Sequence, residues 1–142
     1  MRLIQRGRDQ WGSGEYFSSR GNRVHNGVDI RWHYEDSVVA LCDGLVTKIG
    51  YPYDPHGSKG HFRYVEVSDC AGSLARYFYV DPIVEVGYML KEGDVLGSCQ
   101  DLEHTYPGIT NHFHFEVLVY VNRKKVYLNP VQYLEALGHE LS

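Results

Sequence analysis

The sequence predicts a mainly β domain built on an antiparallel β-sheet, with one C-terminal helix. Its apolar segments are short, rich in β-branched and aromatic residues, and separated by Gly, Pro, Asp and Asn, which is typical of strands joined by turns. Tyrosine, which suits half-buried strand faces, occurs 12 times among the 142 residues. A helical pattern with signals at both ends is found near the C-terminus.

The strand-like segments follow one another along most of the chain. In order, they are residues 24–30, 38–42, 45–50, 62–68, 74–80 and 112–121. Residues 86–97 form two further apolar pieces around Lys91-Glu92-Gly93-Asp94, whose composition is typical of a turn. Two long segments, 51–61 and 98–111, have no periodicity. Long loops of this kind in a compact β domain are often functional.

The C-terminal helix is predicted by its caps as well as by its apolar pattern. Asn129 fits the N-cap, Pro130 fits the first helical position, and Gly138 fits the position after the last turn. The apolar stripe that would pack against the sheet consists of Val131, Leu134 and Leu137.

Composition and charge exclude several classes of protein. The chain has 14 Lys and Arg against 18 Asp and Glu, a formal net charge of −4 with no dense basic run, which argues against nucleic-acid binding. No segment is apolar and long enough for membrane insertion, and the first residues lack the apolar core of a signal peptide. Cys42, Cys70 and Cys99 are odd in number and scattered, as expected of free thiols made in a reducing cytosol. We therefore expect one monomeric domain over residues 1–142, made in the cytoplasm.

The segment NHFHFEV, residues 111–117, places two histidines in an apolar run. Because side chains alternate along a strand, His112, His114 and Glu116 share one face and the apolar residues between them face the core. Two such histidines taken alone are usually surface residues, so a site here needs further ligands from elsewhere in the chain.

A second segment, RVHNGVDI, supplies those ligands. His25 and Asp29 are four residues apart, so an extended strand places both on one face, and Gly27 leaves room beside them. Zinc accepts imidazole nitrogen and carboxylate oxygen, and catalytic zinc takes three protein ligands. His25, Asp29 and one of His112 and His114 would supply three, and the remaining imidazole would act as a general base.

The other histidines lie in loop-like or terminal contexts, where surface placement is expected. They are His33, His56, His61, His104 and His139. His61 and His104 adjoin the long loops and could line a groove.

These motifs together resemble the LytM/lysostaphin-type zinc metallopeptidases, which cleave peptide bonds in bacterial peptidoglycan. The resemblance covers about residues 16–137, and its motifs occur in the family's order. FSSRGNRVHNGVDI is similar to the opening motif, in which an arginine precedes H-x-G-x-D, and NHFHFEV to the H-x-H-F-E signature. SVVALCDGLVTKIG and VEVGYMLKEGDVLG resemble two hairpins of the family, and LNPVQYL its closing helix. The resemblance implies the family's fold, an antiparallel sheet of the duplicated hybrid motif type with a groove over one face.

By position, the resemblance implies that His25, Asp29 and His114 are the zinc ligands and that His112 is the catalytic base or proton shuttle. Glu116 is either a partner that fixes an imidazole tautomer or a solvated surface carboxylate.

One position departs from the family's pattern. The family has a second catalytic histidine in a Y-x-H-L segment, where RYFYVDP has Tyr79. A neutral phenol can donate a hydrogen bond to a developing oxyanion, so Tyr79 is the expected oxyanion donor, and a merely packed aromatic ring is the alternative. Strand alternation predicts that Tyr79 shares a face with Tyr77.

The expected function is zinc-dependent hydrolysis of peptide bonds in peptidoglycan. The long loops would wall the groove, and their aromatics Tyr51, Tyr53 and Tyr106 suit an extended substrate with small side chains. The missing signal peptide predicts a bacteriophage lysis enzyme (endolysin) or a virion-associated wall-degrading protein, made in the cytoplasm and acting on the cell wall. An exported domain whose signal was removed is another possible source.

Two alternatives belong to other classes of protein. The first is a catalytically inactive relative that binds peptidoglycan or activates another hydrolase, with a purely structural metal. The second is a biotinyl- or lipoyl-type carrier, suggested by residues 86–97, but Lys91 lies in an ordinary turn and the histidine pairs would have no role.

Overall fold

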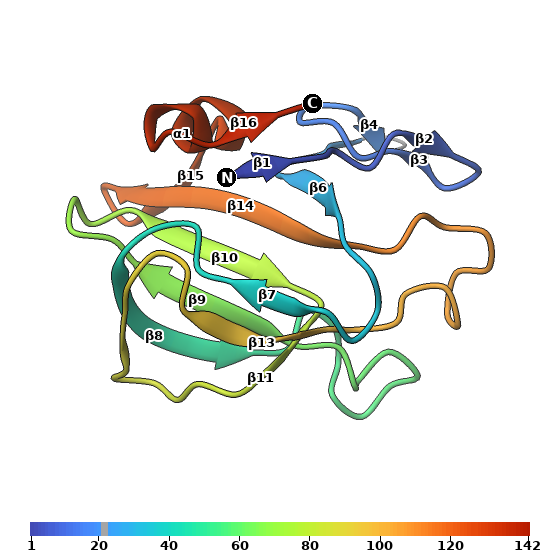
Figure 1. Ribbon diagram of the computed structural model, residues 1–142, viewed down its shortest axis with the longest axis horizontal. Coiled ribbons are helices and arrows are strands. Elements are labelled where there is room, and N and C mark those ends of the chain that lie inside the picture. The colour runs from blue at the N-terminus through green and yellow to red at the C-terminus, as the bar shows by residue number, and fades with distance from the viewer. Residues whose placement is uncertain (21–22) are drawn as a thin grey trace.

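The computed structural model describes residues 1–20 and 23–142 (Figure 1). Among these residues there is one helix, α1 (Pro130–Ala136). The strands are β1 (Arg2–Leu3), β2 (Arg8–Asp9), β3 (Gly12–Ser13), β4 (Ser19–Arg20), β5 (Arg23–Val24), β6 (Val28–Arg31), β7 (Ser37–Val39), β8 (Gly44–Gly50), β9 (Tyr64–Ser68), β10 (Leu74–Phe78), β11 (Val80–Pro82), β12 (Met89–Leu90), β13 (Val95–Cys99), β14 (His112–Val121), β15 (Lys124–Leu128) and β16 (Glu140–Leu141).

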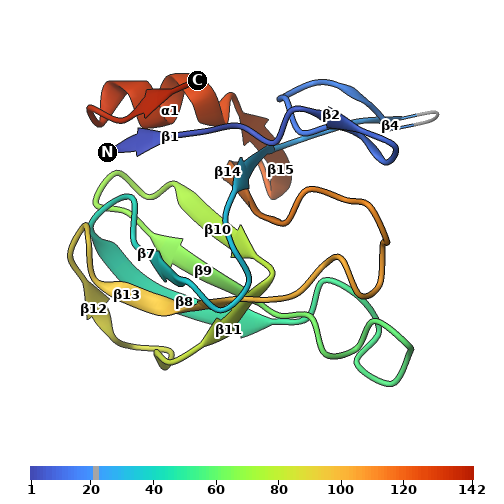
Figure 2. The ribbon, with the colours of Figure 1, turned by 45° about the vertical axis from the view of Figure 1, so that its right-hand side comes forward.

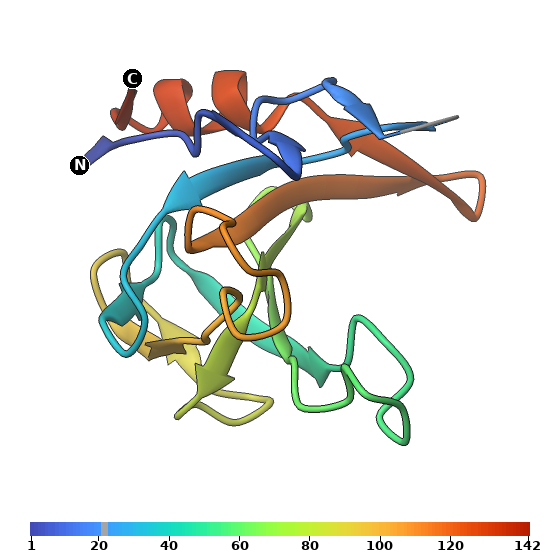
Figure 3. The same ribbon diagram turned by 90° about the vertical axis from the view of Figure 1, so that its right-hand side faces the viewer.

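A seven-stranded antiparallel sheet forms the framework, in the order β12-β8-β9-β10-β14-β15, with β6 paired to β14. A three-stranded antiparallel sheet, β11-β13-β7, lies beside it (Figure 2). The views agree that α1 and the N-terminal strands lie on the same side of β14 (Figure 3). Pairing of β1 with β16 brings the two ends of the chain together. No helix of the described residues is long and apolar enough to cross a membrane.

The hydrophobic core confirms the predicted alternation along β14. Phe113, Phe115 and Val117 are at most 1% exposed and belong to the main core cluster. A smaller cluster of Phe62, Leu102 and Ile109 lies beneath the two long loops. The opposite face of β14 is therefore left for its polar residues.

The helix caps are confirmed, but one residue of the predicted apolar stripe is wrong. The Asn129 side chain accepts hydrogen bonds from two backbone N–H groups of the first turn, and Gly138 has φ +94°, the left-handed conformation expected after a helix. Leu137 is 43% exposed, because the seven-residue helix ends before its third turn. His139 is buried, contrary to the surface placement expected, because the turn at Gly138 directs it inward, and its Nε2 lies 2.7 Å from the carbonyl oxygen of Leu41.

Two predicted strands are interrupted. The segment 24–30 is extended only at its ends, because β5 stops at Val24 and β6 starts at Val28. The segment 74–80 breaks at Tyr79, where φ is +71°. All three cysteines are free, Cys70 being exposed and the others buried.

Candidate metal centre and active site

The three side chains expected to bind a metal converge at the start of β14. His25 comes from the segment between β5 and β6, Asp29 from β6 and His114 from β14, where it lies directly across from Asp29 in the antiparallel pair. His25 Nε2 lies 2.9 Å from His114 Nδ1, and Asp29 Oδ1 lies 3.1 Å and 3.0 Å from these two atoms. A Cβ at Gly27 would come within 2.6 Å of the His114 ring, so this glycine permits the approach.

Both imidazoles of this cluster are fixed by an acceptor on their far side. His25 Nδ1 donates to the carbonyl oxygen of Glu15 at 3.0 Å, and His114 Nε2 donates to Glu116 Oε1 at 2.8 Å. Glu116 is buried and is therefore a partner of His114, not a solvated carboxylate. The other ring nitrogen of each histidine, His25 Nε2 and His114 Nδ1, then faces Asp29 Oδ1. Two imidazole nitrogens and one carboxylate oxygen, all within 4.8 Å of one another, fit the ligand set of zinc.

The charges around His114 stabilise a cation at this place. Burial alone would lower the pKa of His114, but its hydrogen bonds with Asp29 and Glu116 outweigh burial and raise that pKa to about 9. Without a metal, the ring therefore holds an extra proton at Nδ1 at neutral pH. A metal cation held by Nδ1 would take the place of that proton.

Asp29 faces His25 and His114 with Oδ1 and two arginines with Oδ2. Its Oδ2 accepts from Arg6 Nη1 at 2.9 Å and lies 3.7 Å from Arg20 Nη2. Burial would raise the pKa of Asp29, but the surrounding histidines and their hydrogen bonds hold it well below its usual value. Arg6 was not expected from the sequence, because a single arginine in the N-terminal segment has no spacing that marks it.

His112 lies beside the three-residue cluster and outside it. Its Nδ1 donates to the carbonyl oxygen of Thr110 at 2.8 Å, which leaves the Nε2 lone pair unprotonated in the neutral ring, 3.4 Å from Asp29 Oδ2. Burial lowers the pKa of His112 below its usual value and outweighs the charge of Asp29. The ring is thus neutral at neutral pH and able to accept a proton at Nε2.

Tyr79 points toward the same site, and the prediction that it shares a face with Tyr77 is wrong. Tyr77 is fully buried in the main core, whereas Tyr79 lines the pocket, because the left-handed φ at Tyr79 breaks the strand alternation. Its backbone N–H donates to Arg63 and its carbonyl accepts from Gln100, each at 2.8 Å. A non-glycine residue held in this conformation is uncommon and is often found at functional sites.

The Tyr79 phenol is held in place from the loop side. Its Oη lies 3.0 Å from Tyr53 Oη, and its ring centroid lies 5.8 Å from that of His112. Burial and the neighbouring Tyr53 phenol raise the pKa of Tyr79 well above its usual value, so the phenol keeps its proton at neutral pH.

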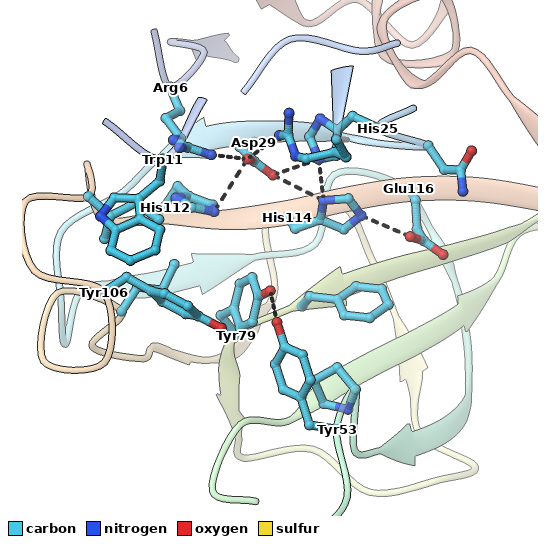
Figure 4. A pocket seen from close by; sticks show the side chains of 16 residues that line it. Arg6, Trp11, His25, Asp29, Tyr53, Tyr79, Tyr106, His112, His114 and Glu116 are labelled. Carbon is cyan, nitrogen blue, oxygen red and sulfur yellow. Dashed lines mark hydrogen bonds and ion pairs between the residues drawn. The ribbon is translucent and has the colours of Figure 1, made fainter. Parts of the chain in front are cut away.

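These side chains line one pocket of about 420 Å³ (Figure 4). Tyr53, Tyr79 and Tyr106 lie across the pocket from the histidines. The Lys59 ammonium lies 5.0 Å and 4.9 Å from the ring centroids of Tyr53 and Tyr106, and so links the two long loops.

Three loop residues lie outside this pocket. Tyr51 stacks with Arg63 and does not contribute to the lining. His61 and His104, which were expected to be exposed and able to line a groove, are exposed and line a separate pocket beside Cys99.

A family model described as peptidase family M23 matches residues 23–130, a range that contains every residue of the candidate site except Arg6, Arg20 and the neighbouring N-terminal residues. The chain belongs to peptidase family M23.

The chain is similar to two kinds of known protein. Leukocyte cell-derived chemotaxin-2 of Bos taurus and of Mus musculus are each 32% identical over 108 residues, which is 76% of this chain and 69% of each relative. The antimicrobial peptidase lysostaphin from Staphylococcus simulans superposes with a TM-score of 0.67 at 20% identity, over 92% of this chain and 50% of lysostaphin. This M23 chain therefore spans about half the length of lysostaphin, and the predicted lysostaphin-type β fold is confirmed.

A zinc-containing peptidase from Vibrio cholerae is a further structural relative of this M23 chain. It is 25% identical, with a TM-score of 0.56, over 88% of this chain and 36% of that one.

Proposed function

We propose that this M23 protein is a zinc-dependent hydrolase that cleaves peptide bonds in bacterial peptidoglycan, working as a monomer. One observation carries the proposal: His25 Nε2, His114 Nδ1 and Asp29 Oδ1 converge within 4.8 Å, and a third imidazole, the neutral ring of His112, stands beside them. Membership of family M23 and the fold shared with lysostaphin support the choice of reaction and substrate.

The proposed roles follow from the hydrogen bonds of each side chain. His25, Asp29 and His114 would hold the zinc ion. When bound, zinc would supply Lewis-acid chemistry that activates water and polarises the scissile carbonyl group. His112 accepts a proton at Nε2, because its Nδ1 is occupied by the Thr110 carbonyl, and returns that proton to the leaving amine.

Tyr79 would donate its hydroxyl hydrogen to the oxyanion that develops on the substrate. For that, Tyr53 must be the donor in the bond between the two phenols. Burial raises the pKa of Tyr79 more than that of Tyr53, and the Lys59 ammonium over the Tyr53 ring opposes the rise at Tyr53. Tyr53 is therefore the more acidic phenol and the better donor of the two. The Tyr79 hydrogen is then free to point into the pocket.

The shape and lining of the pocket favour an extended peptide with small side chains. Trp11, Tyr53 and Tyr106 give it flat aromatic walls, and residues of the two long loops form part of its lining. Stem and cross-link peptides of peptidoglycan contain alanine or glycine and fit such walls.

Hydrolysis of purified peptidoglycan tests this function. The wild-type protein with one equivalent of zinc should lower the turbidity of outer-membrane-permeabilised cells, and mass spectrometry of the released fragments identifies the bond cut. His112→Ala, which should keep zinc, is the matched inactive control. Intact peptidoglycan after incubation with the zinc-loaded wild type would refute the proposal.

A bacteriophage lysis or virion-associated role is the biological setting we propose for this activity. Production in the bacterial cytosol should leave cells intact until the inner membrane is permeabilised, and then lyse them. Cells that stay intact after permeabilisation would contradict this setting, even where the purified enzyme is active.

A second candidate function is a relative that binds peptidoglycan, or activates another hydrolase, without cleaving it. Tyr79 at the place of the family's second catalytic histidine favours it, as do relatives that are named chemotaxins. This candidate predicts full zinc binding and co-sedimentation with peptidoglycan without released fragments. Released fragments that disappear in His112→Ala would exclude it.

A further inference from the structure

The N-terminal segment lies against the candidate site although it precedes the range matched by the family model, which begins at residue 23. Its β2–β3 hairpin reaches the long loop 98–111. Trp11 Nε1 donates to the carbonyl oxygen of Pro107 at 2.9 Å, and the Trp11 ring packs edge-on against Tyr106 at 5.2 Å. The segment is therefore part of the wall of the pocket (Figure 4).

Arg6, in the N-terminal segment, donates hydrogen bonds to the carboxylates of both Asp9 and Asp29. The side chain is 3% exposed. Its Nη1 donates to Asp29 Oδ2 at 2.9 Å, while its Nε and Nη2 donate to the two oxygens of Asp9 at 3.0 Å and 2.7 Å. A Cβ at Gly14 would come within 2.6 Å of the Arg6 Cβ, so that glycine leaves the space in which the arginine lies.

Asp9 continues the chain of bonds toward His112. Its Oδ2 also accepts the backbone N–H of Thr110 at 2.9 Å. The carbonyl oxygen of Thr110 accepts His112 Nδ1 at 2.8 Å, and His112 Nε2 lies 3.4 Å from Asp29 Oδ2. The contacts thus form a closed ring through Asp29, Arg6, Asp9, Thr110 and His112.

We propose that Arg6 and Asp9 are positioning residues of this site: Arg6 fixes the orientation of the ligand Asp29, and Asp9 fixes the tautomer of His112 through Thr110. The first half rests on the proposed zinc site, and the second half needs neither zinc nor hydrolysis. The proposal assigns the N-terminal segment a role in the chemistry of the pocket, beyond holding the fold together.

The geometry supports positioning in both directions. The Asp29 carboxylate can rotate only if its Oδ2 leaves Arg6. Because the bidentate pairing with Asp9 fixes the Arg6 guanidinium, Arg6 in turn holds Asp29 Oδ1 toward His25 and His114. The Thr110 peptide can turn its carbonyl away from His112 only if its N–H leaves Asp9. Loss of either bond frees a group that the proposed chemistry needs in one orientation.

Zinc affinity tests the Arg6 half. Arg6→Met should weaken zinc binding by about 10- to 100-fold in competition with a chromophoric chelator, the range typical for loss of a group that orients a ligand. Arg8→Met removes an exposed arginine two residues away and should bind zinc as the wild type does. Arg6→Lys keeps the charge but not the fork, so it should fold even if Arg6→Met does not, with a smaller loss of affinity. Unchanged zinc affinity in either folded Arg6 variant overturns this half.

The nitrogen spectrum of His112 tests the Asp9 half in the metal-free protein. At a pH where the ring is neutral, ¹⁵N chemical shifts should report a proton on Nδ1 in the wild type and a mixture of both tautomers in Asp9→Ala. Asp81→Ala, in an exposed strand position of β11, should keep the wild-type spectrum. A wild-type tautomer in folded Asp9→Ala overturns this half, whether or not the protein proves to be a hydrolase.

Discussion

Tyr79→Phe is the substitution that separates the proposed mechanism from its alternatives. It removes one hydroxyl group and almost no volume, so the ring still packs beside His112 and Phe62. If the hydroxyl stabilises the oxyanion, its loss should cost about 2.7–4 kcal/mol of transition-state stabilisation, or about a hundred- to a thousandfold in kcat.

The same substitution should change stability much less. It breaks one hydrogen bond, to Tyr53 Oη, and bonds of this kind contribute ~1 kcal/mol. Tyr53 is only partly buried, so water can replace the lost partner. Zinc content should not change, since the phenol is not among the converging ligand atoms.

Three measurements on each variant give the outcome: release of peptidoglycan fragments, zinc content and melting temperature. Tyr120→Phe, which loses an exposed hydroxyl, is the matched control. Tyr79→His restores the family's residue in a left-handed conformation that histidine tolerates better than most residues, so it should retain activity. Turnover that is undiminished in Tyr79→Phe would remove Tyr79 from the mechanism.

Three further predictions concern the surroundings of the site. Glu116→Gln keeps an acceptor for His114 Nε2 but removes the negative charge of Glu116. Zinc affinity measured by chelator competition should therefore fall about tenfold. An unchanged affinity would contradict the role of Glu116 as the partner of His114. Removal of zinc by a chelator at neutral pH should lower the melting temperature. Zinc at a concentration a thousandfold above its Kd stabilises the folded state by about 4 kcal/mol, which corresponds to a shift of roughly 10 °C. An unchanged melting temperature would mean that no metal stabilises the fold. Burial opposes ionisation of Asp9, but the hydrogen bonds from Arg6 outweigh burial and lower the pKa of Asp9. The stability contributed by the Arg6–Asp9 pair should therefore be present above about pH 4 and be lost as the pH falls below that value. Acid titrations followed by circular dichroism should therefore show a steeper loss of stability in the wild type than in Asp9→Asn, and parallel curves would refute the pairing.

The sequence predicted those features that depend on neighbouring residues. Alternation along NHFHFEV separated the polar face of β14 from its core face, and Asn129 and Gly138 marked the ends of the helix, because each signal is contained within a few residues. His25 and Asp29 belong to one short motif, and the pairing of β6 with β14 brings that motif beside the two histidines of β14. The residues alone left His112 and His114 open as the third member, and only the family resemblance implied His114.

The features that the sequence did not predict depend on contacts between distant segments. Arg6 and Asp29 are 23 positions apart, and Asp9 and Thr110 are 101 apart, so no local pattern connects them. The interruption of the strand at Tyr79 coincides with backbone hydrogen bonds from Tyr79 to Arg63 and from Gln100 to Tyr79. A tyrosine in a run of β-forming residues does not predict a left-handed backbone conformation. The buried position of His139 likewise involves a contact with the Leu41 carbonyl oxygen, 98 positions away in the sequence.

The central proposal is that His25, Asp29 and His114 bind zinc whereas His112 acts as the general base. Measuring zinc content and hydrolysis side by side tests this most directly. The wild type should bind close to one zinc per chain and release peptidoglycan fragments. His25→Ala, Asp29→Ala and His114→Ala should each lose most of the zinc and all of the hydrolysis, because each removes one of three converging ligand atoms. His112→Ala should keep the zinc and lose the hydrolysis. Full zinc occupancy in the three ligand variants, or loss of zinc in His112→Ala with retention in His114→Ala, would contradict the account.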